Sequence, residues 1–82
     1  MISIKDLLNK IKWDKKEDPS DYTIVYKDRV EGKYKEMAYN DIKKIEGTFM
    51  VLDRGGEEVN IPLHRVKQVR KNWLVIWNRE KV

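Results

Sequence analysis

The sequence contains no cysteine and only one histidine, His64, among its 82 residues. The lack of cysteine excludes disulfide bonds, thiolate metal sites and a thiol nucleophile. A zinc site would need carboxylate ligands almost alone, so we expect no metal ion and no cofactor. No apolar run approaches the roughly 18 residues of a membrane-spanning helix, and the N-terminus lacks the apolar core of a signal peptide. We therefore expect a cytoplasmic protein with no membrane partner.

Proline and glycine are also scarce, with two and four copies, whereas charged and hydrophobic residues make up 39% and 40% of the chain. This hydrophobic content favours a folded core over disorder. A chain of this length buries only roughly 60% of its unfolded surface, which leaves room for one core. We predict a single domain over residues 1–82. The net charge of +4 is compatible with a polyanionic partner but does not require one.

The N-terminal segment shows helical periodicity. Ser3 and Asp6 have the spacing of a capping box, with the shorter aspartate in place of glutamate. We predict an amphipathic helix over residues 2–12 that packs on a sheet. Its apolar stripe consists of Ile4, Leu7, Leu8 and Ile11.

Short apolar segments joined by turn residues follow the helix. They predict strands over residues 22–26, 34–39, 48–52, 58–61, 66–70 and 73–77. Between the second and third of these, Ile42 and Ile45 predict a single helical turn that Gly47 ends. Both faces of the last strand are apolar, so we expect this strand to be central or enclosed. The predicted fold class is α+β: an N-terminal helix on a curled, mainly antiparallel sheet of about six short strands, forming a small half-open barrel.

Residues 61–66 are the strongest candidate for a polar site. Pro62 cannot donate to a strand ladder, so a strand should end near Ile61 and place His64 and Arg65 at a bend. An arginine fork beside a histidine suits a phosphate or a carboxylate. The alternative is that His64 caps a turn and Arg65 is a solvated charge at a strand end.

Four blocks of the sequence together resemble a family of small, uncharacterised archaeal proteins that carry an RNA cyclic-group-end recognition domain. The resemblance implies a module that recognises RNA ends with a 2′,3′-cyclic phosphate in RNA processing or repair. It implies single-stranded RNA ends as ligands and suggests an RNA-processing enzyme as a partner. Residues 33–58 carry little of the family pattern. The blocks comprise Leu8, Lys10, Ile11, Trp13 and Asp14; Asp21, Tyr22, Ile24, Tyr26, Asp28 and Arg29; Ile61, Pro62, His64, Arg65, Val66 and Val69; and Ile76, Trp77 and Arg79.

The chemistry of a cyclic phosphate indicates which side chains within these blocks to consider. A compact monoanion needs cationic donors, and an unstacked terminal base can lie on an aromatic ring. Asp14 and Asp28 are candidates for orienting an arginine or accepting from a ribose or base. The alternatives are that the tryptophans belong to the core and that Asp28 and Arg29 form a solvated turn. The candidate phosphate donors are Arg29, His64, Arg65 and Arg79, and the candidate stacking rings are Trp13, Tyr26 and Trp77.

No catalytic motif accompanies these residues. The chain lacks paired His-x-Thr or His-x-Ser motifs, a glycine-rich phosphate loop and a Ser-His-Asp order. We therefore predict a binding module and not an enzyme, with phosphoesterase chemistry at His64 and a lysine as the alternative. A second hypothesis is a protein-interaction or assembly subunit without a nucleic-acid ligand. The first predicts that Arg29, His64, Arg65 and a tryptophan share one concave patch; the second predicts a dominant exposed apolar patch or sheet edge. The oligomeric state is left open.

Overall fold

The computed structural model describes residues 3–79, which begin with the amphipathic helix α1 (Ile4–Trp13). Ser3 caps the helix, because its side-chain oxygen accepts from the Asp6 N–H at 3.2 Å. Asp14 ends it with extended backbone geometry. The predicted helix is confirmed from Ile4 onward and extends one residue further than predicted, whereas residue 2, where the prediction began, lies outside the described residues. Its four stripe residues are all buried. The helix in these residues is not long and apolar enough to cross a membrane.

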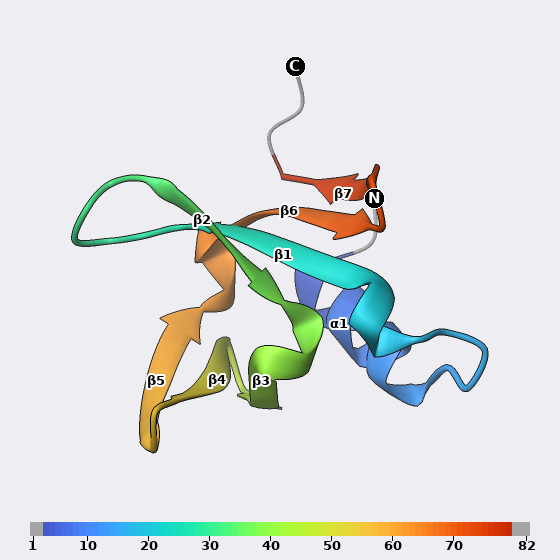
Figure 1. The fold of residues 1–82 in the computed structure, drawn as a ribbon, viewed down its shortest axis with the longest axis horizontal. Coiled ribbons are helices and arrows are strands. Elements are labelled where there is room, and N and C mark those ends of the chain that lie inside the picture. The colour runs from blue at the N-terminus through green and yellow to red at the C-terminus, as the bar shows by residue number, and fades with distance from the viewer. Residues whose placement is uncertain (1–2, 80–82) are drawn as a thin grey trace.

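Seven antiparallel strands follow within residues 3–79, arranged in two sheets (Figure 1). The first sheet has the order β2-β1-β6-β7, and the second has the order β3-β4-β5. The prediction of an α+β fold is confirmed, but the strand number is larger than six, and two sheets replace the single curled one. Residues 3–79 form no closed barrel. The strands are β1 (Tyr22–Lys27), β2 (Tyr34–Ala38), β3 (Ile42–Glu46), β4 (Phe49–Arg54), β5 (Glu57–Pro62), β6 (Val66–Lys71) and β7 (Leu74–Asn78).

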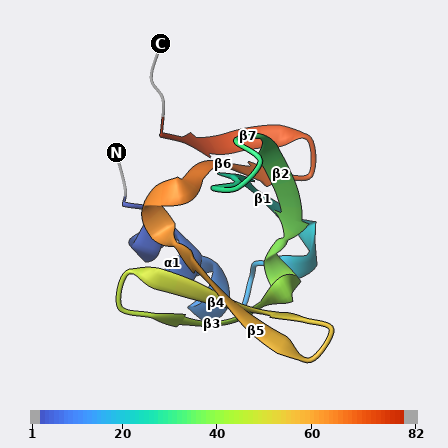
Figure 2. The same cartoon turned by 90° about the vertical axis from the view of Figure 1, so that its left-hand side faces the viewer.

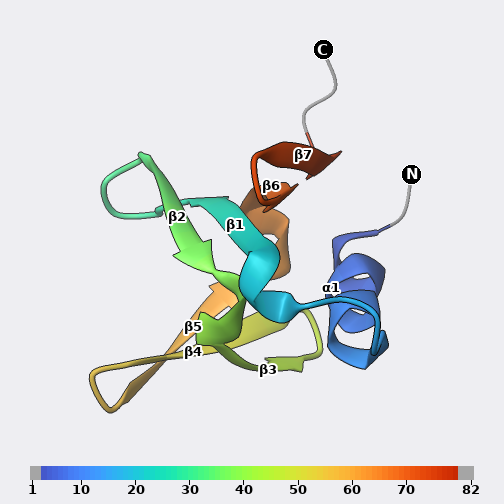
Figure 3. The same cartoon turned by 45° about the vertical axis from the view of Figure 1, so that its right-hand side comes forward.

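The two sheets and the helix enclose one core. Figure 2 shows the four-stranded sheet above and the three-stranded sheet below, with α1 closing one side between them. Figure 3 shows the same arrangement from another direction, with α1 facing both sheets. The buried Tyr39 ties the helix to this core, since its hydroxyl donates to the Leu8 carbonyl at 2.8 Å. Both sheets and the helix contribute residues to the same apolar cluster.

The segment at residues 42–46 is a strand, so the predicted helical turn was wrong. A short 3-10 turn, η2 (Tyr39–Asp41), precedes it. The register between β3 and β4 shifts between Ile42 and Lys44, which marks a bulge. A bulge inserts one residue and breaks the two-residue alternation of a strand. Ile42 and Ile45, three positions apart, therefore both pack against the core, which imitates helical spacing.

The last strand lies at an edge and is not enclosed, so that prediction was also wrong. β7 pairs with β6 on one side only and is the last strand of its sheet. Trp77 points into the core and is 6% exposed. The residues before it, at positions 73–76, leave large apolar surfaces in solvent. The sheet thus ends in an uncovered apolar strand.

Two 3-10 turns carry the chain from one sheet to the other. η2 connects β2 to β3, and η3 (Leu63–Arg65) connects β5 to β6. Each turn buries its first residue, which is Tyr39 in η2 and Leu63 in η3. The strand after each turn, β3 or β6, is followed by a two-residue hairpin turn. The Leu63 N–H donates to the Thr48 carbonyl at 2.8 Å, which fixes η3 against the β3–β4 hairpin. The predicted bend at His64 and Arg65 is this turn.

Candidate RNA-end binding site

The turn η3 sends its two polar side chains in different directions. A 3-10 helix has 3.0 residues per turn, so successive side chains point about 120° apart. Leu63 takes the inward direction and is 5% exposed. His64 and Arg65 are consequently directed to two separate cavities. We name these the arginine cavity and the histidine cavity.

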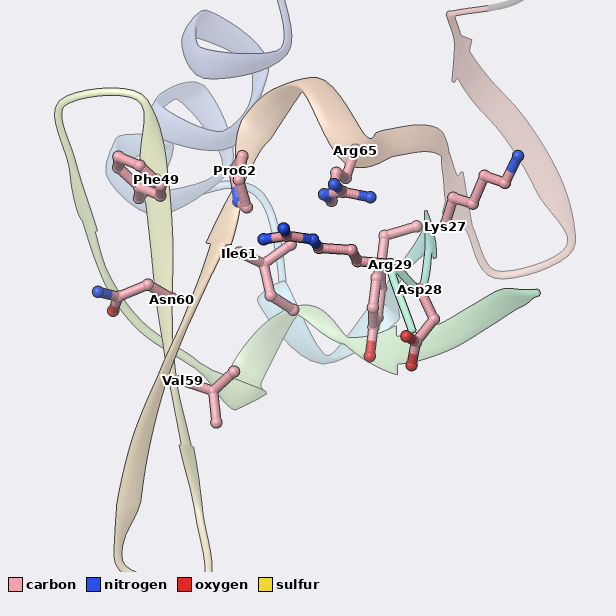
Figure 4. Close-up of a pocket in the computed structure, with 10 residues that line it drawn as sticks. Lys27, Asp28, Arg29, Phe49, Val59, Asn60, Ile61, Pro62 and Arg65 are labelled. Carbon is pink, nitrogen blue, oxygen red and sulfur yellow. The ribbon is translucent and has the colours of Figure 1, made fainter. Parts of the chain in front are cut away.

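The arginine cavity lies between the end of β1 and the β4–β5 hairpin and has a volume of about 330 Å³. In Figure 4 the guanidinium groups of Arg29 and Arg65 face the same space beside Ile61 and Pro62, whereas Lys27 extends away from them. The cavity thus combines two cations with an apolar wall. Its lining residues are Tyr26, Lys27, Asp28, Arg29, Phe49, Val59, Asn60, Ile61, Pro62 and Arg65.

The two arginines of this cavity differ from the cations that the structure places in ion pairs. Five lysines and arginines elsewhere form ion pairs with carboxylates; they are Lys35, Lys43, Lys44, Arg70 and Lys71. Within residues 3–79, no carboxylate or carbonyl is bonded to the guanidinium of Arg29 or Arg65. Two cations that face each other without a bonded carboxylate favour an anion between them.

Asp28 organises the loop that presents Arg29. Its carboxylate accepts from the N–H groups of Val30 and Glu31 at 2.7 and 3.2 Å and pairs with the Lys35 ammonium at 2.7 Å. The hydrogen bond from Lys35, followed by those from the two N–H groups, lowers the pKa of Asp28 to about 2. Asp28 thus has its bonds within the β1–β2 loop and to the start of β2.

Phe49 is a part of the cavity that the sequence analysis did not identify. Phe49 is 44% exposed, and its backbone pairs with Pro62 across the β4–β5 hairpin. Counting back from the turn at Gly55 and Gly56 places it there, because Arg54 pairs with Glu57 and each further step adds one pair. The hairpin register was therefore the signal that could have identified Phe49, although residues 33–58 carry little of the family pattern.

The histidine cavity, of about 420 Å³, lies on the other side of η3 near the start of α1. His64 and Arg79 line it together with Ser3, Lys5 and Thr48. Arg79 is not directed at an anion, because its Nε donates to the Val66 carbonyl at 2.9 Å and one Nη donates to the Leu63 carbonyl at 3.1 Å. Its guanidinium also lies 5.0 Å from the centre of the Trp77 ring. Arg79 therefore holds η3 in place from both ends.

The three predicted stacking rings lie in different environments. Tyr26 lines the arginine cavity but is 4% exposed, and Trp77 is buried in the core. Trp13 is exposed at the end of α1, where the Lys12 ammonium lies 5.2 Å from its ring centre. Asp14, beside it, accepts from the Lys16 N–H at 2.9 Å. No tryptophan lines either cavity.

The structure thus brings together part of the predicted patch. Arg29, Arg65, Tyr26 and Asp28 meet at the arginine cavity. His64 and Arg79 meet at the histidine cavity, and Trp13 and Asp14 lie at neither. In the described part of the chain, no three acidic or histidine side chains are grouped to hold a metal ion. The arginine cavity is therefore the stronger candidate for an anion site.

Comparison with known proteins gives a consistent picture. The model of the MJ1316 RNA cyclic group end recognition domain matches residues 1–79. A UPF0248 protein of Saccharolobus solfataricus is 38% identical over 81 residues, covering 95% of this chain and 98% of its own. A UPF0248 protein of Metallosphaera sedula is 35% identical over 78 residues, covering 95% and 94%. One of Saccharolobus islandicus is 32% identical over 81 residues, covering 95% and 100%. No solved structure matches.

Proposed function

The protein belongs to the MJ1316 RNA cyclic group end recognition domain family, and from this membership together with the arginine cavity we propose that it binds RNA ends carrying a 2′,3′-cyclic phosphate. The observation that carries the proposal is the pair of guanidinium groups, Arg29 and Arg65, that face one concave space without a carboxylate partner among the described residues.

The chemistry of the ligand suits this cavity. A 2′,3′-cyclic phosphate has two non-bridging oxygens that share one negative charge, and a guanidinium fork can donate to both. Two forks from different elements would hold the phosphate from two sides. The adjoining wall of Ile61, Pro62 and Val59 offers apolar contact for the ribose. This combination favours a terminal nucleotide over free inorganic phosphate.

Phe49 supplies a surface for the terminal base. An exposed aromatic ring at the cavity rim can stack on a base, which is worth about 1–3 kcal/mol. Asn60, opposite Val51 in the hairpin, also lines the cavity and offers an amide for a base edge. Because the terminal base must be unstacked to reach Phe49, the proposed ligand is a single-stranded end.

We propose binding without catalysis. Opening a cyclic phosphate by acid–base chemistry uses two titrating groups placed on opposite sides of phosphorus. His64, the one histidine of the chain, lines the other cavity. The setting that follows from such a role is RNA processing or repair, in which an RNA-processing enzyme would act on the recognised end.

The test is a fluorescence-anisotropy titration with one short, unstructured RNA that ends in a 2′,3′-cyclic phosphate, a linear 3′-phosphate or a 3′-hydroxyl, at fixed salt. We expect the cyclic end to bind most tightly. Arg29→Ala and Arg65→Ala should each weaken its binding at least tenfold, because a hydrogen bond to a charged group contributes about 1.5–3 kcal/mol. His64→Ala should leave binding within about twofold of the unsubstituted protein.

Arg70→Ala is the matched control. It removes the same charge from the outer face of the first sheet, where Arg70 pairs with Glu36 at 3.1 Å. Equal losses in Arg70→Ala and Arg65→Ala would reduce the effect to general attraction between a basic protein and RNA. Equal affinity for the cyclic and hydroxyl ends would refute end recognition. A loss in His64→Ala alone would move the site to the histidine cavity.

A further inference from the structure

The apolar edge strand β7 is a feature of the molecule that RNA-end binding does not use. Trp73 is 96% exposed, Leu74 69%, Val75 43% and Ile76 39%. β7 ends the order β2-β1-β6-β7, so one side of its backbone faces no strand among residues 3–79. A strand edge presents N–H and C=O groups that can pair with another chain.

The other three edges of the two sheets are protected by charge. Within the strands, β2 carries two charged residues, β3 carries three, and β5 carries two and ends in a proline. Charged side chains and proline are the usual devices that prevent edge-to-edge association. β7 reads Leu-Val-Ile-Trp-Asn and carries neither. It is therefore the one strand edge in the described part of the chain that lacks this protection.

We propose that β7 pairs antiparallel with β7 of a second copy of this chain. The two-fold arrangement would join the sheets into one continuous eight-stranded sheet. Because β7 carries no charge, self-pairing places no like charges opposite each other, whereas β3 would oppose lysines to lysines in several registers. A pairing centred on Ile76 aligns all five residues of each strand.

The exposed apolar surface has the size that such a dimer needs. With an area near the upper end of the aromatic range of roughly 150–250 Å² for Trp73 and smaller areas for the three aliphatic residues, the exposed fractions of residues 73–76 correspond to roughly 400–500 Å² per molecule. If pairing covered all of this surface, two copies would bury at most roughly 1,000 Å², near the lower limit of specific interfaces. The partner that fits the free edge of β7 is thus a strand of similar length with an apolar face. An RNA strand fits less well, because β7 supplies no cation.

The experiment is sedimentation-velocity analysis over a range of concentrations. The unsubstituted protein should reach twice its 9.9 kDa chain mass. Val75→Lys places a charge in the paired edge and should weaken self-association at least tenfold. Trp73→Ser alters a residue that is almost fully exposed and cannot disturb the core, so it provides a second variant if Val75→Lys unfolds. Val30→Lys is the matched control, since Val30 is 91% exposed in the β1–β2 loop.

Hydrogen exchange shows which strand is involved. Amide exchange at residues 74–78 should slow as the protein concentration rises, while amides of β2 should not change. A monomer at every concentration up to the millimolar range would overturn the proposal. So would a dimer that survives both Val75→Lys and Trp73→Ser, or one whose only protected edge is β2. The proposal would also fail if the protein stayed monomeric and its β7 amides exchanged more slowly only when a different polypeptide was added.

Discussion

Replacing Tyr39 with phenylalanine tests how the helix is joined to the two sheets. The Tyr39 ring is buried and contacts the Tyr22 ring edge-on with centroids 6.5 Å apart, so phenylalanine keeps the packing. What is lost is the hydrogen bond from the hydroxyl to the Leu8 carbonyl at 2.8 Å. Leu8 lies inside α1, where the helix itself uses this carbonyl, so no orphaned acceptor results. We expect a loss of about 1 kcal/mol in the free energy of unfolding.

For a domain of this size, a loss of about 1 kcal/mol lowers the melting temperature by roughly 4–8 °C. The assay is thermal unfolding at neutral pH, followed by far-ultraviolet circular dichroism. Tyr34→Phe is the matched control, because Tyr34 is largely exposed on β2, and it should change stability by less than about 0.5 kcal/mol. Equal melting temperatures for Tyr39→Phe and the unsubstituted protein would refute the assigned role of the bond.

The same substitution also affects stability in alkali. Burial raises the pKa of Tyr39, and burial together with the hydrogen bond to Glu17 raises the pKa of Tyr22. Both hydroxyls therefore stay protonated in the folded state at pH values where they ionise in the unfolded chain. Their contribution to the free energy of unfolding is complete below about pH 10 and is lost as the pH rises above that value. Tyr39→Phe should show a smaller alkaline loss than the unsubstituted protein.

Two further substitutions test the loop and the helix start. Asp28→Ala should weaken binding of the cyclic-phosphate RNA about tenfold and Asp28→Asn less, because an amide oxygen still accepts the loop N–H groups. The pKa of Asp28 is lowered to about 2, so the stabilisation from its loop contacts should be complete above about pH 4 and be lost as the pH falls through 2. The amide proton signal of Arg29, followed by NMR as the pH is lowered, would show this loss. Unchanged RNA binding in Asp28→Ala would contradict the role of this loop. Ser3→Ala should cost about 1 kcal/mol in thermal unfolding, whereas Ser20→Ala in the exposed loop should cost less; equal losses would argue against the N-cap.

Much of the fold follows from local patterns in the sequence. The stripe of α1 and its Ser3 cap define the helix, and the alternation of Tyr22, Ile24 and Tyr26 defines β1 with all three buried. The turn at Gly55 and Gly56 is predictable because glycine adopts a positive φ without strain. In the structure both residues have a positive φ. These features depend only on neighbouring residues, so the sequence alone determines them.

The errors arise where distant residues decide the structure. The bulge in β3 brings Ile42 and Ile45 to the same side, and nothing near them in the sequence reveals it. The apolar pattern of β7 indicates that both faces avoid water, but a sequence cannot state whether its own chain or another covers them. If β7 pairs with a second copy, the expectation of an enclosed strand describes the dimer and not the single chain.

The candidate site shows the same division. Pro62 correctly predicts where β5 ends, and the cationic character of Arg29 and Arg65 indicates an anion. Whether adjacent residues share a site depends on the turn that carries them. In an open bend, His64 and Arg65 could approach one ligand from neighbouring positions, whereas in a strand they would point to opposite faces. In the 3-10 turn η3 they diverge, so only Arg65 meets Arg29.

Arg79 connects the two proposals physically. It directly follows β7, and its guanidinium binds the carbonyls of Leu63 and Val66 at the two ends of η3. A second copy paired with β7 would restrict the backbone that positions this guanidinium and would thereby steady the turn that presents Arg65. Disrupting the dimer should consequently raise the mobility of η3 without removing any group from the arginine cavity. Loss of RNA affinity in Val75→Lys with the cyclic-end preference intact would fit this connection, whereas loss of the preference itself would place β7 within the RNA site.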